Sequence, residues 1–368
     1  MLSFTSRRRL PALGVALLAL AATLALLPPT APARADDGDA AATPATVGVA
    51  TRPAGEDGRP DGRSRFTYTA DPGQTVTDRV LVGNTGTARQ DFTVYATDAF
   101  NGGDGAFSLL ATADTPTAVG AWLRFDDGSD RVKFSLEPDE VRLLSFTIAF
   151  PADATPGDHV GGLVASVVEE GQQVSVDRRV ATSIFARVSG DLQPALSITS
   201  YDASYEGDWW NPFSGSVKLH YTVSNPGNVA LAANLTSGVA TWFGIPATGL
   251  QGGSIPMLLP GNTATYEFTV GGVGQWLYLN PSTVLNPFVD SPDSSQQLTV
   301  SPITRDTVTF GVPWMLLILL ALAAVIFLLL RWRRRRDEER AREWVDYMER
   351  ATAAEAEGLA GAAKSGSS

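Results

Sequence analysis

The chain has 368 residues, no cysteine and a formal net charge of −11 at pH 7. Without cysteine it forms no disulfide bond and no thiolate centre. An acidic protein is not attracted to a phosphate backbone, so we exclude non-specific nucleic-acid binding and expect no nucleic-acid partner. Hydrophobic residues make up 44% of the sequence, which is enough to build sizeable cores.

The first 35 residues have the pattern of a secretory signal peptide. Three arginines at residues 7–9 precede an apolar run at residues 10–27, and Ala33-Arg34-Ala35 forms an A-x-A cleavage site. An uncleaved first membrane helix is the alternative. The Pro28-Pro29 break favours cleavage, and the mature chain is then expected to begin at residue 36.

Residues 36–46 are rich in Ala, Asp and Pro and have no periodicity, which predicts a flexible leader. From residue 47 to about residue 303 the sequence consists of short alternating runs separated by Gly, Pro, Asn and Asp. This pattern is typical of β-sandwiches, and no amphipathic helix interrupts it.

A weak internal repeat predicts the number of domains. Each half has a strand, then an Asn-x-Gly turn at Asn84 or Asn225, then a Pro-led turn at Pro138 or Pro260 that begins another strand. The sequence therefore predicts an all-β fold of two tandem immunoglobulin-like β-sandwich domains plus one C-terminal transmembrane helix. We place the two domains at residues 47–190 and 191–303.

We expect a transmembrane helix at residues 312–331, because residues 312–330 are apolar, carry no charge and are about long enough to cross a bilayer as a helix. A tryptophan lies at each end of the stretch, where aromatic rings favour the membrane interface. A run of arginines follows it, which predicts that the C-terminal side is cytoplasmic. These anchor residues are Trp314, Trp332, Arg331, Arg333, Arg334, Arg335 and Arg336. We expect a single-pass plasma-membrane protein with extracellular domains and a cytoplasmic tail at 332–368, in which residues 337–356 form a short amphipathic helix.

Signatures of chemistry are scarce. His159 and His220 lie far apart and in different predicted domains, so we predict no metal and no cofactor. The oxygen-rich segment 98–105 lacks the spacing of a calcium loop. The acidic pair Asp126-Asp127 precedes a glycine, which indicates a hairpin turn, although a wall glycosidase using one of these carboxylates is an alternative. We predict that the chain is not an enzyme.

Aromatic residues concentrate in the second predicted domain, in particular at Trp209 and Trp210. Side chains alternate along a strand, so two adjacent tryptophans cannot both enter the same core. Exposed tryptophan often stacks on sugars or partner surfaces. Packing at a domain edge or against the bilayer is the other interpretation.

The first predicted domain resembles a known family. Its sequence contains Val82-Gly-Asn84-Thr-Gly86, then Trp122-Leu123, and finally Pro156-Gly157-Asp158-His159-Val-Gly161-Gly162. Over residues 47–190 this succession resembles the N-terminal domain of the bacterial WxL-interacting protein family. The resemblance implies a Gram-positive cell-surface protein whose first domain is implicated in peptidoglycan binding and whose second domain contacts other surface or host molecules.

We therefore expect a non-enzymatic protein that binds peptidoglycan or cell-wall-associated proteins through its first domain and the lipid bilayer through one helix. The resemblance and the exposed tryptophans point to a set of candidate binding residues: Trp122, Pro156, Gly157, Asp158, His159, Gly161, Gly162, Trp209 and Trp210. An accessory subunit of a transport or signalling assembly, acting through the region of Trp344 in the tail, is the alternative.

Overall fold

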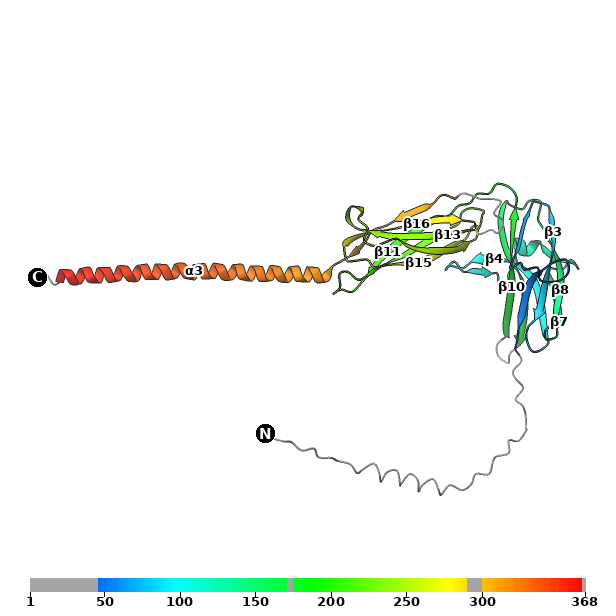
Figure 1. Ribbon diagram of the computed structural model, residues 1–368, viewed down its shortest axis with the longest axis horizontal. Coiled ribbons are helices and arrows are strands. Elements are labelled where there is room, and N and C mark those ends of the chain that lie inside the picture. Colours follow the sequence, from blue (N-terminus) through cyan, green and yellow to red (C-terminus); the bar gives the residue numbers. More distant parts are fainter. Residues whose placement is uncertain (1–45, 171–174, 290–299, 366–368) are drawn as a thin grey trace, which may run out of the picture. The chain divides into compact units, whose positions relative to one another are not determined.

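The computed structural model describes residues 46–170, 175–289 and 300–365 (Figure 1). The predicted signal peptide and leader lie almost entirely outside these residues. The described chain forms four β-sheets and one long C-terminal helix. The predicted fold class, two β-sandwiches followed by an apolar helix, is confirmed.

The first sandwich consists of two sheets. One has the strand order β1-β3-β8-β6, with bounds β1 Val49–Ala54, β3 Thr75–Asn84, β8 Val141–Ala149 and β6 Leu123–Phe125. The other has the order β2-β10-β9-β4-β5, and β7 also pairs with β4. Its bounds are β2 Phe66–Ala70, β10 Ser175–Val188, β9 Gly157–Glu170, β4 Gln90–Asn101, β5 Phe107–Leu109 and β7 Arg131–Leu136.

Alternating apolar residues build the core of this sandwich. Phe66 of β2 and Phe146 of β8 are fully buried, and their rings meet edge to face with centroids 5.2 Å apart. The short helix α2 (Val119–Trp122) contributes Val119 to the same core. Each such side chain stabilises the fold by roughly 1.5–3 kcal/mol through burial.

The chain crosses from one sheet to the other between β1 and β2. β1 pairs antiparallel with β3, whereas β2 pairs parallel with β10. Arg63 in the crossing donates to both carboxylate oxygens of Asp78 on β3, at 2.7 and 3.0 Å, and the Tyr68 hydroxyl donates to Asp78 Oδ2 at 2.7 Å. Burial alone would raise the pKa of Asp78, but these hydrogen bonds outweigh it and lower the pKa below its usual range.

The second sandwich also has two sheets. One has the order β11-β12-β15, with bounds β11 Ser197–Glu206, β12 Ser216–Ser224 and β15 Thr263–Gly271. The other has the order β14-β13-β16-β17, and β18 also pairs with β16. Its bounds are β14 Gln251–Leu258, β13 Leu231–Ala240, β16 Leu277–Phe288, β17 Ile303–Asp306 and β18 Thr309–Gly311.

The internal repeat has a structural basis in two buried asparagines. Asn84 donates to the carbonyls of Ala88 and Leu136 and accepts from the amide of Gly86. Asn225 makes the equivalent three bonds in the second sandwich, to Val229, Leu258 and Gly227. Each asparagine satisfies the backbone of its own turn and ties that turn to the Pro-led turn nearby.

The C-terminal helix α3 spans Trp314–Ser365 without interruption. Its N-terminal part is apolar and long enough to cross a membrane. We predicted a separate amphipathic tail helix at residues 337–356, but the structure continues the same helix through that segment. No glycine or proline lies between residues 331 and 356, so nothing in the sequence terminates the helix there.

Candidate functional site

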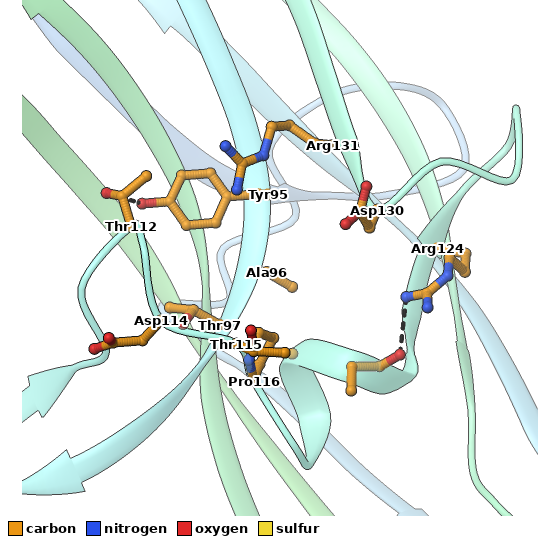
Figure 2. A pocket seen from close by; sticks show the side chains of 12 residues that line it. Tyr95, Ala96, Thr97, Thr112, Asp114, Thr115, Pro116, Arg124, Asp130 and Arg131 are labelled. Atoms are coloured by element: carbon orange, nitrogen blue, oxygen red, sulfur yellow. Dashed lines mark hydrogen bonds between the residues drawn. The ribbon is translucent and has the colours of Figure 1, made fainter.

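A polar cavity of about 150 Å³ opens on the first sandwich where β4, α2 and the start of β7 meet (Figure 2). Residues from several segments line it, among them Tyr95, Thr97, Thr112, Asp114, Arg124 and Arg131. Phe92, Val94 and Ala96 of β4 belong to the core, so alternation directs Tyr95 and Thr97 to the opposite face of the sheet.

A hydrogen-bond chain fixes the floor of the cavity. The hydroxyls of Tyr95 and Thr112 lie 2.9 Å apart, and Thr112 donates to Asp177 on β10 at 3.1 Å. The guanidinium of Arg131 lies over the Tyr95 ring, 4.9 Å from its centroid. The hydroxyl bond and the cation–π contact together hold the Tyr95 ring in place beside Arg131.

Thr97 presents an unusual group to this cavity. The residue is 2% exposed, and its hydroxyl oxygen has no hydrogen-bond partner among the described residues. A buried hydroxyl without a partner costs about 1–3 kcal/mol. The structure thus leaves one hydroxyl of a cavity-lining residue without a hydrogen bond within the described part of the chain.

The rim of the cavity carries both signs of charge, with Asp114 and Asp130 beside Arg124 and Arg131. All four residues are exposed. Arg124 is oriented by donating to the carbonyls of Ala121 and Leu123, at 2.8 and 2.7 Å. This rim suits a small polar ligand that has both donors and acceptors rather than an apolar one.

Asp98 positions α2 at the edge of the cavity. Its carboxylate accepts hydrogen bonds from the amides of Thr117, Ala118 and Gly120, at 2.6, 2.8 and 2.8 Å. Two of these amides, those of Ala118 and Gly120, belong to the helix start, where the first turn supplies no backbone partner. Among the described residues, no group of three His, Asp or Glu side chains could hold a metal ion.

The candidate residues of the first domain gather near the start of β9, and none of them lines the cavity. Trp122 and His159 are half-buried and pack together with ring centroids 4.7 Å apart. Gly161 and Gly162 are buried within the sheet, where a side chain would meet Thr97 and Leu109. Whether these residues bind a ligand stays a prediction.

The preceding candidates, Pro156, Gly157 and Asp158, contact the second sandwich. The Pro156 carbonyl accepts from the side-chain amide of Asn228 at 3.0 Å, and the Asp158 amide donates to the Asn228 carbonyl at 2.8 Å. Gly157 has a φ of 123° and packs so closely on Asn228 that a side chain would collide with it. The glycine is thus required by local geometry.

Trp209 and Trp210 lie elsewhere, in the connection between β11 and β12 of the second sandwich. They are 62% and 55% exposed. The structure therefore does not bring them together with the candidates of the first domain.

The acidic pair considered for glycoside cleavage lies in the exposed turn between β6 and β7. Asp127 accepts from the amide and the hydroxyl of Ser129, at 3.0 and 2.6 Å. The Ser129 hydrogen bonds lower the pKa of Asp127. A general acid in glycoside cleavage needs a raised pKa, so this turn does not favour that role.

A second notable feature is the edge of β10. β9 pairs with β10 along its whole length, but β2 covers the other side only from Ile184 to Val188. No strand of the described residues pairs with that side of residues 175–183. Residues 176–181 are all exposed.

Sequence reasoning did not find the cavity or the open edge. The cavity is lined by residues scattered between positions 95 and 131, and no short motif connects them. The open edge depends on where β2 stops pairing with β10, which the strand pattern does not reveal. The only hint of the open edge in the sequence was the length of the two strand-like runs of alternating residues before and after Gly171.

Comparison with protein-family models and with curated proteins finds no match for this sequence. Solved structures with a similar fold include the class 5 fimbriae chaperone CfaA, at 12% identity and a TM-score of 0.34, with 68% of this chain and 98% of CfaA covered.

Another is the Salmonella enterica SafA pilin in complex with the SafB chaperone, at 14% identity and a TM-score of 0.30. This match covers 71% of the present chain and 97% of the matched chain. A third is the CsuC–CsuE chaperone-tip adhesion subunit complex of Acinetobacter baumannii, at 12% identity and a TM-score of 0.31, with 71% and 97% covered. The resemblance to the WxL-interacting protein family stays a prediction.

Proposed function

We propose that this chain is a membrane-tethered, non-catalytic protein of the cell envelope that binds a wall-associated protein through its first sandwich. The single observation that carries the proposal is the open edge of β10 at residues 175–183. An exposed strand edge offers a row of backbone donors and acceptors to an extended segment of another protein.

The side chains along this edge support strand addition. Val176 and Val180 are exposed, and they share the face of β10 whose later members, Ile184 and Ala186, enter the core. An added strand would extend that apolar face, so it gains side-chain burial together with backbone hydrogen bonds. The partner would supply apolar residues at alternate positions.

Charges at the hairpin limit pairing between copies of the chain. Arg178 forms an exposed ion pair with Glu169 at 2.9 Å, and Arg179 lies 4.0 Å from Asp177. Charged side chains on an edge strand disfavour indiscriminate edge-to-edge association. Selective binding would then depend on a partner strand whose charges complement this pattern.

A photo-crosslinking residue at position 180 in the full chain, in its native membranes, tests the proposal. The expected result is a covalent adduct with a protein, weakened by a Val176→Lys substitution in the same chain. The matched control carries the crosslinker at Val141, an exposed valine on β8. An equal adduct from position 141, or none from position 180, would overturn strand addition.

Peptidoglycan is the second candidate ligand, because polar and charged residues such as Thr112, Asp114 and Arg131 line the cavity of Figure 2. Stem peptides and sugars have the mixed donors and acceptors that this cavity suits. The test is co-sedimentation of the full chain, in detergent, with isolated sacculi over a range of salt. Binding that tolerates salt and falls in Thr97→Val and Arg131→Met, but not in Arg89→Met, would support it.

A further inference from the structure

One end of the second sandwich is unusually apolar. Several strands end there next to one another, so the four segments that follow or precede them come together. The pairs at these strand ends are Glu206–Ser216, Ser216–Gly271, Ala240–Asn280 and Leu277–Gly311. The segments are residues 207–215, 241–250, 272–277 and 307–313, and we call this set the apolar end.

Large hydrophobic side chains at the apolar end point into solvent. Phe243 has 99% of its surface exposed, at the tip of the short helix η2 (Trp242–Gly244). The other exposed members are Trp209, Trp210, Phe213, Trp242, Ile245, Leu250, Trp276, Leu277, Val308 and Phe310. A soluble domain rarely exposes so many large apolar residues in one place without a partner surface.

Charge is nearly absent from the same region. Across the four segments Asp208 is the only charged residue, although the whole chain has 39 acidic and 28 basic residues. Transfer of a charge out of water is costly, whereas transfer of Trp and Phe side chains is favourable. The composition of the apolar end therefore suits a low-dielectric surface.

The backbone beneath these side chains is fixed. The Trp242 indole donates to the Trp276 carbonyl at 3.0 Å, and its ring lies 5.1 Å from that of Tyr278. The side-chain amide of Gln275 donates to the backbone carbonyl of Asp208 at 2.8 Å, and its backbone N–H donates to the carbonyl of Pro212 at 2.7 Å. Three of the four segments are thereby bonded to one another, so the rings are presented from a rigid support.

The chain connects this end directly to the apolar helix. Gly311 is the last residue of β18, and α3 begins three residues later at Trp314. Three residues span at most about 11 Å. The start of the membrane-crossing segment is therefore held within a short distance of the apolar end, whatever direction the helix takes.

We propose that the apolar end is a membrane-contact surface, which inserts its Trp and Phe side chains into the headgroup region of the bilayer that α3 crosses. The inference rests on the membrane tether of the proposed function. Tryptophan favours this depth because its ring is apolar while its N–H remains able to hydrogen-bond. The lipid surface is the occupant that the three-residue connection brings within reach.

The absence of cysteine allows the test to be made on the full chain. Single variants Phe243→Cys, Leu322→Cys and Val141→Cys are labelled with a fluorophore and reconstituted in phosphatidylcholine vesicles that contain nitroxide lipids. A label at position 243 should be quenched most by a headgroup nitroxide and one at 322 by a deep acyl nitroxide. A label at 141, on the first sandwich, should be quenched by neither.

The outcomes separate the two proposals. Quenching at 322 but not at 243 overturns membrane contact by the apolar end and leaves the tether intact. No quenching at 322 overturns the tether and the inference together. In the Phe243→Cys chain, Trp209→Asp with Trp210→Asp should reduce the quenching at 243, whereas Phe288→Asp, at the other end of the sandwich, should not. An unchanged signal in the double variant would also contradict the proposal.

Discussion

The carboxylate of Asp158 forms a two-pronged ion pair with Arg187, with nitrogen–oxygen distances of 2.6 and 2.9 Å. The same carboxylate accepts the amide of Ala230 from the second sandwich at 2.8 Å. Val160, Ala230 and Leu259 form a small buried cluster beside it. A charged pair in the first sandwich is thus hydrogen-bonded to the backbone of the second.

We expect Asp158→Asn to destabilise this contact by about 3 kcal/mol, because it removes the negative charge from a largely buried ion pair. The side chains of Arg187 and Asp158 are only 15% and 10% exposed. Hydrogen exchange of the Ala230 amide should accelerate. Glu169→Gln, which breaks an exposed pair, should cost less than about 1 kcal/mol and leave Ala230 unchanged. Equal effects would contradict the role of Asp158.

The Arg63–Asp78 pair predicts a dependence of stability on pH. The pKa of Asp78 is lowered in the folded protein, so its contribution is complete above the unfolded value of about 3.9 and is lost as the pH falls through the folded value. Acid titration of the unfolding free energy should therefore be less steep in Asp78→Asn below about pH 4. Asp153→Asn, an exposed carboxylate, is the control and should retain the steep loss.

Gly157→Ala should be strongly destabilising. The backbone there has a φ of 123°, and an added methyl group would collide with the carbonyl of Asn228. Gly62→Ala is the matched control, since Gly62 has a φ of 85° but nothing within 4 Å of an added Cβ. The control should cost only about 1–2 kcal/mol of backbone strain. Thermal unfolding of both variants tests the difference, and similar losses would exclude the close approach to Asn228.

Thr97→Val should raise the free energy of unfolding by about 1 kcal/mol when no ligand is bound, because it removes a buried hydroxyl without a partner. Thr283→Val is the opposite case. Thr283 is also buried, but its hydroxyl lies 2.9 Å from that of Tyr201 and 2.7 Å from that of Ser237, so its loss should destabilise the chain. A destabilising Thr97→Val would show that the hydroxyl is already satisfied.

The sequence was most informative where local chemistry repeats. Asn84 and Asn225 each precede a glycine by two residues, and this spacing correctly predicted two related turns because the side chain must accept that glycine's amide. The apolar helix was similarly evident, since no charge occurs between Trp314 and Leu330. In both cases the determining residues lie close together in the chain.

Features that depend on distant residues could not be predicted in this way. The parallel pairing of β2 with β10 joins residues more than a hundred positions apart, and alternation specifies a face but not a neighbour. The hydroxyl of Thr97 looks like any strand threonine until segment 110–118 and α2 cover it. The continuous α3 was missed because the change from apolar to charged residues was interpreted as a change of element.

The chain enters the second sandwich at one end of its strands and leaves it at the opposite end. β11 begins at Ser197, which pairs with Ser224 beside the contacts to the first sandwich, whereas β18 ends at Gly311, beside Leu277. A force applied between the first sandwich and α3 therefore acts along the strands and loads their hydrogen bonds in shear, many at once, rather than breaking them one at a time. Such an arrangement resists tension.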